Sequence, residues 1–344
     1  MRNVKRFIHN ISKSTKSLIK LSEQKNDGGE IKVSIHCFVF NQEKYISRCL
    51  DSFLNQLIDF NVEILVHDDC SSDHSKEIIE SYCKKYPTLI KPIYEEKNVY
   101  SRTGNFLEIA EILNKQSKGA YIAICEGDDY WTDPLKLFLQ VSILSNYNDC
   151  HFCVHRVKVV SDNSNYVLKD NQIPSFKMKT RFLNDKAFIS YVHDKYNFQT
   201  SSYFFRKVDY DKLFLEKPLY MRLMPTDDEV LLRHFGSIGN TCFIDRIMSI
   251  YVQYSDGSWS KEHEDNEDDS KRRRFISAAN EFDIYSSYKY HKSCKQFLTK
   301  IELYSLMKVK RYDVIFKNNE LRKMLRKIDF RTYLSLSLRR MFGK

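Results

Sequence analysis

The order of the apolar segments constrains the fold of this chain more than any other feature. Between residues 31 and 146, four short apolar runs each precede a segment in which apolar side chains have helical spacing. The runs cover residues 31–40, 62–67, 90–94 and 121–125. Repeated alternation of strand and helix is typical of an open sheet, so the sequence predicts an α/β fold with a mainly parallel sheet flanked by helices.

Acidic side chains stand where two of these predicted strands end. Asp68 and Asp69 follow the second run, and Glu126, Asp128 and Asp129 follow the fourth. Ligands of open α/β sheets bind beyond the carboxyl ends of the strands, so we expect these carboxylates to converge on one edge of the sheet.

The carboxylates of residues 126–129 repel one another at the point where a buried strand emerges. A divalent cation is one way to compensate them, because Mg²⁺ and Mn²⁺ prefer carboxylate oxygens and leave positions open for phosphate oxygens. The alternative is a solvated acidic turn before the helix that Pro134 starts. For Asp68 and Asp69 the alternative is a capped turn, in which we expect Asp73 rather than Asp69 to be the cap.

A second acidic cluster lies in the other half of the chain. Asp227, Asp228 and Glu229 precede apolar side chains with helical spacing, which predicts a helix with acids in its first turn. Such acids can stabilise the helix N-terminus, or one of them can serve as a catalytic base. Between residues 150 and 206 the alternation breaks, and only 151–160 and 200–206 have the composition of strands.

Length and composition exclude several classes of protein. With 344 residues, 42% hydrophobic, the chain can form one large α/β domain with an appendage or two modest domains. It has no apolar window of about 18 residues, as a membrane span requires, and residues 1–30 lack the apolar region of a secretion signal. The nine cysteines, an odd number, favour buried thiols in a reducing cytoplasm over a disulfide framework.

Charge is distributed unevenly along the chain. The formal net charge is +10, with +4 in residues 1–30 and +14 in residues 271–344, so residues 31–270 carry −8. An acidic core argues against nucleic acid as a partner of that core. The basic C-terminal segment has helical patterns that can lie on an anionic membrane surface, or it can form helices with solvated basic faces.

Three sequence blocks together resemble family 2 glycosyltransferases, which have the nucleotide-diphosphosugar (glycosyltransferase A) fold. The blocks are residues 33–41 (VSIHCFVFN), 63–73 (EILVHDDCSSD) and 119–131 (GAYIAICEGDDYW). Residues 133–141 (DPLKLFLQV) strengthen the likeness, which extends over about residues 31–260, to bacterial enzymes of capsule, O-antigen or other surface-polysaccharide synthesis.

The resemblance implies roles for individual residues. Phe38 and Asp69 would contact the nucleotide base, Asp128 the ribose, and Asp129 the diphosphate through Mn²⁺ or Mg²⁺. Glu126 occupies the first acidic position of the family's Asp-x-Asp element, where aspartate is commoner. The expected donor-binding residues are therefore Phe38, Asn41, Asp69, Glu126 and Asp128, and the expected metal ligands are Asp129 and Asp128.

By the same resemblance, the acidic cluster at 227–229 holds the base of an inverting transfer. Spacing to Arg233 favours Asp227, whereas the Pro-Thr-x-Asp run and Leu231 three residues later favour Asp228, the residue that we prefer. The family's Tyr-Arg-x-His segment is represented here by Tyr251-Val-Gln-Tyr254, without the arginine and the histidine.

These patterns predict three domains and one leading function. Residues 1–30 form a basic N-terminal segment, 31–260 the catalytic domain and 261–344 a basic helical C-terminal extension. The function expected is metal-dependent transfer of a sugar from a nucleotide-diphosphate donor, with a UDP-sugar favoured, to a glycan or lipid-linked glycan. The location expected is the cytoplasm, with peripheral membrane contact through residues 271–344.

Two other classes of function compete with this prediction. A basic membrane- or nucleic-acid-binding protein with a degenerate transferase core would explain the +14 segment but not the converging carboxylates. A nucleotidyltransferase would carry a Gly-rich, basic phosphate loop after the first strand, which Cys37-Phe-Val-Phe-Asn-Gln does not provide.

Overall fold

A computed structural model describes residues 4–12, 15, 17–25, 28–104, 106–161, 178–194, 198–253, 255 and 269–341. The chain divides into two compact units. Unit 1 comprises residues 1–188, 196–217 and 226–266, and unit 2 comprises residues 189–195, 218–225 and 267–344. Each unit has its own set of packed elements, and we describe them separately.

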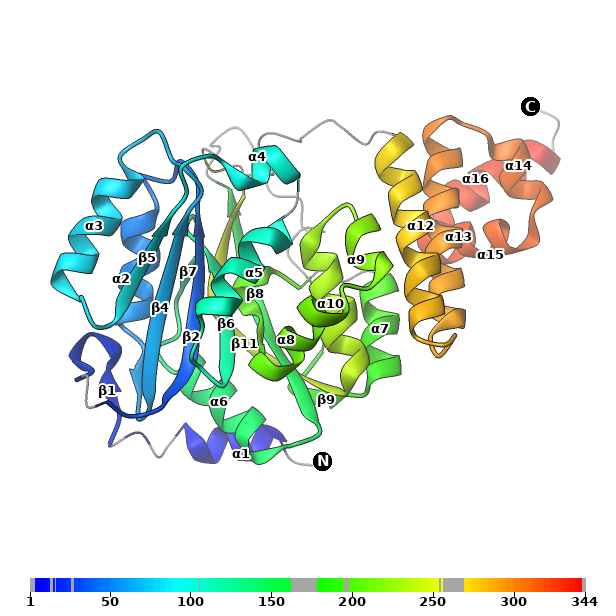
Figure 1. The fold of residues 1–344 in the computed structure, drawn as a ribbon. Coiled ribbons are helices and arrows are strands. Elements are labelled where there is room, and N and C mark those ends of the chain that lie inside the picture. Colours follow the sequence, from blue (N-terminus) through cyan, green and yellow to red (C-terminus); the bar gives the residue numbers. More distant parts are fainter. Residues whose placement is uncertain are drawn as a thin grey trace. The chain divides into compact units, whose positions relative to one another are not determined.

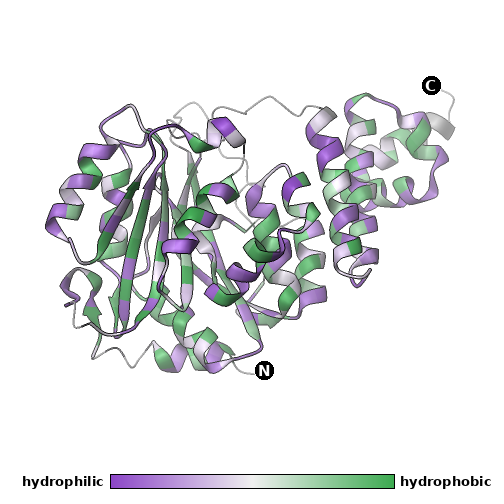
Figure 2. Ribbon diagram, in the orientation of Figure 1, coloured by the Kyte–Doolittle hydropathy of each residue, from purple (hydrophilic) through white to green (hydrophobic). Residues whose placement is uncertain are grey.

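The described strands of unit 1 include a nine-stranded sheet whose first half is parallel (Figure 1). In sheet order its strands are β5 (Ile90–Tyr94), β4 (Asn61–Asp68), β2 (Ile31–Val39) and β6 (Tyr121–Glu126). These are the four strands that the sequence predicts. Figure 2 shows hydrophobic residues concentrated along them, as expected of strands covered on both faces.

The second half of the sheet is mixed. After β6 the order continues with β10 (Phe204–Arg206), β8 (Cys150–Ser161), β11 (Asn240–Gln253) and β7 (Tyr130–Trp131), while β9 (Arg181–Leu183) also pairs with β11. Strand β10 is antiparallel to both its neighbours, and β8 and β11 are parallel to each other. The predicted fold class is confirmed, with antiparallel pairs added beyond β6.

Helices cover the two faces of this sheet. Side chains alternate between the two faces along β2, and His36 lies on the face covered by α5 (Phe106–Gln116) and α8 (Lys207–Glu216). Its ring forms a hydrogen bond with Ser117, directly after α5, and packs near Tyr210 of α8. On the opposite face, Cys37 contacts Cys49 of α2 (Ile46–Leu54). The remaining helical elements of unit 1 are α1 (Val4–Ile11), η1 (Leu21–Glu23), α3 (Ser75–Lys85), α4 (Val99–Thr103), α6 (Lys136–Asn146), η2 (Thr200–Ser202) and α10 (Asp227–Ile238).

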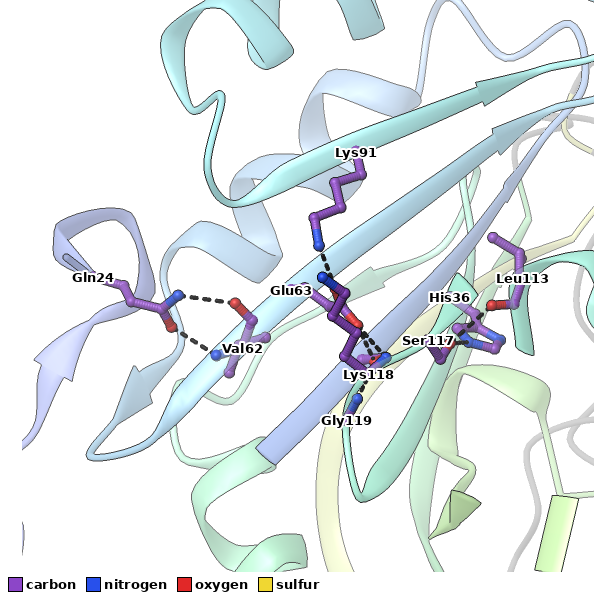
Figure 3. Close-up of polar contacts among 10 residues, drawn as sticks. Gln24, His36, Val62, Glu63, Lys91, Leu113, Ser117, Lys118 and Gly119 are labelled. Carbon is purple, nitrogen blue, oxygen red and sulfur yellow. Dashed lines mark hydrogen bonds and ion pairs between the residues drawn. The ribbon is translucent and has the colours of Figure 1, made fainter. Parts of the chain in front are cut away.

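The N-terminal residues that the structure describes pack onto unit 1. Phe7 of α1 lies edge-on to the ring of Tyr147, and Val4 is buried. Strand β1 (Ile19–Lys20) pairs with β3 (Leu57–Ile58), and the Gln24 side chain bonds both backbone groups of Val62 (Figure 3). These contacts hold the start of the chain against β3, the beginning of β4 and Tyr147.

A buried carboxylate, that of Glu63, lies near the start of β4 and joins three segments by hydrogen bonds (Figure 3). Glu63 is fully buried and accepts hydrogen bonds from Ser34 Oγ, the Lys118 amide and Lys91 Nζ. Gly119 then enters β6 with its amide donating to Ser34 Oγ at 2.9 Å. The approach is so close that a Cβ atom on Gly119 would lie 2.4 Å from the Ser34 backbone nitrogen.

The described cysteines carry free thiols, as the sequence predicts. Cys37, Cys49, Cys125, Cys150, Cys153, Cys242 and Cys294 are buried, Cys83 is partly exposed and Cys70 is exposed. Burial raises the pKa of Cys49 well above its usual value, and it raises the pKa of Cys125 to about 11. The interior thiols therefore act as small apolar side chains.

Unit 2 is helical. Its helices are α9 (Leu219–Leu223), α12 (Asp269–Tyr285), α13 (His291–Lys308), α14 (Tyr312–Lys317), α15 (Asn319–Ile328) and α16 (Phe330–Met341), and α7 (Asp185–Asp194) runs into it from unit 1. Tyr220 of α9 packs on Phe282 of α12, and Leu303, Ile315, Leu321 and Leu325 form a separate buried cluster. Among the described helices, none is long and apolar enough to cross a bilayer.

We expect Gly119→Ala to destabilise the protein strongly, because the methyl group meets the backbone of β2, which cannot move aside as a flexible side chain can. The expected loss is about 3 kcal/mol of unfolding free energy or more, measured by chemical denaturation. Gly104→Ala is the matched control. Gly104 has φ +63° but no atom near its Cβ position, so its loss should be only about 1–2 kcal/mol. Equal losses in the two variants would contradict the close approach.

Candidate active site

An acidic loop lies where β6 ends. Glu126 is the last residue of β6, and Asp128 and Asp129 follow before β7 begins. The loop is anchored to the neighbouring strand because the Gly127 amide donates to the Phe38 carbonyl oxygen at 2.8 Å. A Cβ atom at Gly127 would lie 2.4 Å from Gln42 Oε1, so the loop packs tightly over the end of β2. The sequence prediction that these carboxylates emerge at the carboxyl edge of the sheet is thus met.

The two aspartates of this loop are buried, and Glu126 is partly exposed. Asp129 is 0% exposed and Asp128 3% exposed. Burial, together with the charge of Asp128, raises the pKa of Glu126 to about 8. Burial also raises the pKa of Asp128, and burial with the charges of Asp128 and Glu126 raises the pKa of Asp129 well above its usual value. Because Asp128 and Asp129 are withdrawn from water, they do not belong to a solvated acidic turn.

Distant segments supply hydrogen bonds to the three acids. Thr200 Oγ1 donates to Glu126 Oε1 at 3.0 Å, and Ser255 Oγ donates to Asp128 Oδ2 at 2.5 Å. The Val252 amide of β11 donates to Asp129 Oδ1 at 2.9 Å. Thr200 and Ser255 were not recognised from the sequence. The sequence signals available are that Ser255 directly follows the segment that stands in place of Tyr-Arg-x-His, and that Thr200 begins the strand-like segment 200–206.

The donor set fits a divalent cation held by two carboxylates. Asp128 Oδ1 and Asp129 Oδ2 are buried and make no hydrogen bond to the described residues. Oxygens of this kind suit Mg²⁺ or Mn²⁺, which commonly use one or two carboxylates and complete their coordination with phosphate and water oxygens. The described part of the chain contains no group of three or more His, Cys, Asp or Glu side chains arranged to bind a metal by themselves.

Asp69, the predicted base contact, holds a short helix. Its carboxylate oxygens accept the backbone amides of Val99 at 2.6 Å and Tyr100 at 2.9 Å, in the first turn of α4. Asn98, the N-cap residue of α4, also donates through its side chain to the Asp69 carbonyl oxygen. The sequence did not predict this role, since the bonded residues lie about thirty positions further along. Asp73, by contrast, accepts the Ser75 amide at the start of α3, as predicted.

Asn41 shapes the turn that follows β2. It has φ 51°, a left-handed conformation that asparagine tolerates better than most residues. Its backbone amide donates to Ser71 Oγ, and its side-chain oxygen accepts the Ser72 backbone amide at 2.8 Å. Asn41 thereby joins the turns that follow β2 and β4 by hydrogen bonds. These are the two turns that we expect to face a nucleotide.

The two aspartates at the start of α10 have different surroundings. Asp227 Oδ2 accepts the Phe106 amide, the first of α5, at 2.8 Å. The charge of Asp228 is among the causes of the raised pKa of Glu126. Glu229 instead forms an ion pair with the buried guanidinium of Arg233 one turn later. The assignment of the base to Asp228 or Asp227 stays a prediction.

Some predicted features lie outside the described residues. Tyr254, the last residue of the segment that stands in place of Tyr-Arg-x-His, is one of them. The other predicted donor-site residues lie at the carboxyl edge of the sheet in unit 1. They stand at the ends of the adjacent strands β2, β4 and β6 or directly after them: Phe38, Asn41, Asp69, Glu126, Asp128 and Asp129. Asp228 belongs to α10.

The chain belongs to glycosyl transferase family 2, whose model matches residues 34–208, just over half of the chain. An uncharacterized protein of Mycobacterium tuberculosis is 33% identical over 245 residues, which are 71% of this chain and 63% of that relative. The chain thus covers less than two thirds of that relative's length. The uncharacterized glycosyltransferase EpsJ of Bacillus subtilis is 28% identical over 166 residues, 46% of each protein.

A solved structure shares the fold. Staphylococcus aureus TarS (residues 1–349), crystallised with UDP-GlcNAc, superimposes with a TM-score of 0.59 at 18% identity, covering 80% of this chain and 73% of TarS. The glycosyltransferase A fold and the family expected from the sequence blocks are thereby confirmed.

The buried acids predict a pH-dependent stability that can be measured on metal-free protein. The folded pKa of Glu126 is raised, so the folded state binds more protons than the unfolded state between the ordinary value of 4.5 and about 8. Stability should therefore fall as pH rises through this window. Glu126→Gln removes this charge, so its gain in unfolding free energy should grow from near zero at pH 4.5 to several kcal/mol, on the order of 4, at pH 8.5.

Denaturant titrations in EDTA at the two pH values measure the gain. Exposed Glu77→Gln serves as the control and should follow the wild type at both. A gain that is the same at pH 4.5 and pH 8.5 would show that the pKa of Glu126 is not raised in the folded protein.

Proposed function

We propose that this chain is an inverting, metal-dependent glycosyltransferase that uses a nucleotide-diphosphate sugar, with a UDP-sugar favoured. The observation that carries the proposal is the buried acidic loop Glu126–Asp129 beside Asp228, at the carboxyl edge of a family 2 domain. A protein that merely bound nucleic acid or lipid would have no use for buried, mutually repelling carboxylates at this edge, and they cost folding free energy.

Asp128 and Asp129 are the residues that would hold Mn²⁺ or Mg²⁺. A bound cation supplies positive charge that offsets the negative charge gathering on the departing diphosphate. The protein's own part is positional. Ser255 donates to one oxygen of Asp128 and Val252 to one oxygen of Asp129, and the other oxygen of each would coordinate the cation.

Asp228 is the proposed base. The acceptor hydroxyl is a weak acid, and it must lose its proton as its oxygen bonds to the anomeric carbon. The bond from that carbon to the diphosphate oxygen breaks on the opposite face, which inverts the configuration, and the proton passes to the carboxylate. The charge of Asp228 is among the causes of the raised pKa of Glu126, which supports a place for this acid on the acceptor side of the acidic loop.

A uridine donor is proposed because TarS was crystallised with UDP-GlcNAc and has the same fold. Phe38, near the end of β2, and Asp69, directly after β4, would contact the nucleotide base, and Asn41 would line the same side of the site. The acceptor proposed is a glycan or lipid-linked glycan of a bacterial surface polysaccharide such as capsule or O-antigen, as the likeness of the sequence blocks implies.

The basic helices of unit 2 suit an enzyme whose acceptor is carried on a lipid at the cytoplasmic face of a membrane. Residues 271–344 carry a net charge of +14, and Phe330 and Leu334 of α16 are exposed beside Arg331. A basic surface with projecting apolar side chains can bind anionic lipid headgroups.

Nucleotide titration tests the catalytic proposal. We expect UDP to bind in calorimetry and thermal-shift measurements and to bind at least tenfold more tightly with Mn²⁺, because the diphosphate shares the cation with Asp128 and Asp129. GDP and CDP serve as base controls. Asp129→Ala should lose the gain from Mn²⁺ and the transfer of sugar from UDP-GlcNAc. Absence of binding for all three nucleotides would make the carboxylates structural and refute the proposal.

Vesicle sedimentation of the full chain tests the proposed membrane contact. We expect binding to vesicles with anionic phosphatidylglycerol and little binding to pure phosphatidylcholine, because the attraction is between charges and weakens with salt. The double variant Phe330→Ser, Leu334→Ser should bind more weakly than wild type at equal net charge. Equal binding to both lipids would rule out the electrostatic surface, and tighter binding to duplex DNA would favour the nucleic-acid alternative.

A further inference from the structure

Asp227 makes a contact that a catalytic base does not need. Its Oδ2 atom accepts the amide of Phe106, 121 positions earlier in the chain. This amide is the first of α5, an 11-residue helix whose leading N–H groups have no partner within the helix. A carboxylate at this position satisfies the amide and also interacts favourably with the positive end of the helix dipole.

Phe106 connects this cap to the acidic loop. Its ring lies 4.1 Å from the Phe38 ring, centroid to centroid. Phe38 pairs with Glu126 across β2 and β6, and its carbonyl oxygen accepts the Gly127 amide. A contiguous set of contacts thus runs from Asp227 through the two rings to the backbone of the acidic loop.

The segment before Phe106 is held from the other side by Asp69. As described above, Asp69 accepts the amides of Val99 and Tyr100. Helix α4 ends at Thr103 and is capped by Gly104, which has φ 63°, just before α5 begins. Residues 98–104 and Phe106 are therefore fixed by two aspartates, one from the turn after β4 and the other from α10.

We propose that Asp227 is a positioning residue for the donor site, and that it acts through Phe106 and Phe38 rather than on the acceptor. This inference rests on the proposed function and assigns the two neighbouring aspartates of α10 to separate tasks. Asp227 fixes the start of α5 against the strand that anchors the acidic loop, and Asp228 takes the acceptor's proton. One helix N-terminus thereby sets the geometry of both halves of the site.

Conservative and non-conservative substitutions separate the two roles. In Asp227→Asn the amide oxygen can still accept the Phe106 N–H, whereas Asp227→Ala leaves this amide without its partner. We expect Asp227→Ala to weaken the binding of UDP in the presence of Mn²⁺ at least tenfold, and Asp227→Asn to stay within about threefold of wild type. Asp228→Asn should bind UDP as wild type does and lose transfer from UDP-GlcNAc.

Hydrogen–deuterium exchange gives a second readout that needs no nucleotide. Peptides covering residues 99–110 should exchange faster in Asp227→Ala, by about tenfold at the Phe106 amide, and at the wild-type rate in Asp227→Asn. Peptides from β4 serve as the internal control for global unfolding, and they should exchange alike in all variants.

The outcomes distinguish this inference from the proposed function. If wild type binds none of the nucleotides, the proposed function fails and exchange alone decides the positioning role. If Asp227→Asn and Asp227→Ala weaken UDP binding equally, or if neither changes exchange at residues 99–110, the positioning role is wrong. If both variants bind UDP normally and both lose transfer, Asp227 is the base.

Discussion

The acidic loop at the end of β6 is the feature around which unit 1 is arranged. Asp128 and Asp129 are buried, Glu126 is partly exposed, and one oxygen of each accepts a hydrogen bond from Ser255, Val252 or Thr200. Burial raises the pKa of all three acids, and neighbouring charges add to the rise for Glu126 and Asp129. Under the proposed function, a cation and a diphosphate would relieve this unfavourable arrangement. Strand β11 supports the loop through the Val252 amide.

The predictable part of the fold is the part specified by local pattern. The four parallel strands and their helices follow from apolar periodicity within windows of ten to fifteen residues, and the acidic loops follow because they end those strands. The mixed half of the sheet was predictable only in part, because composition indicates strands at 151–160 and 200–206 but neither their partners nor their directions, and residues 200–202 form the 3-10 helix η2 instead. Strand β10 has three residues, too few for a period, and its direction depends on β6 and β8 rather than on its own sequence.

The residues of the site likewise fall into those that local pattern predicts and those that depend on the tertiary fold. The acids were found because they lie next to one another in the chain, and the family resemblance assigned them to a donor site. The roles of Thr200, Ser255 and the Asp69 and Asp227 caps depend on pairs of residues between about 30 and 127 positions apart. No spacing rule links such pairs, because they meet only through the tertiary fold. A cap on a neighbouring helix, as at Asp73, is local and was predicted correctly.

The distribution of thiols gives this protein a property that is useful at the bench. Cys70 is exposed with a left-handed backbone (φ 63°) directly after Asp69, whereas seven other cysteines are enclosed in the interior. A maleimide dye applied to the native protein would therefore attach first beside Asp69, at the proposed nucleotide site, without prior removal of the remaining thiols. The chain thus has a natural attachment point for a fluorophore whose emission would report the arrival of a nucleotide.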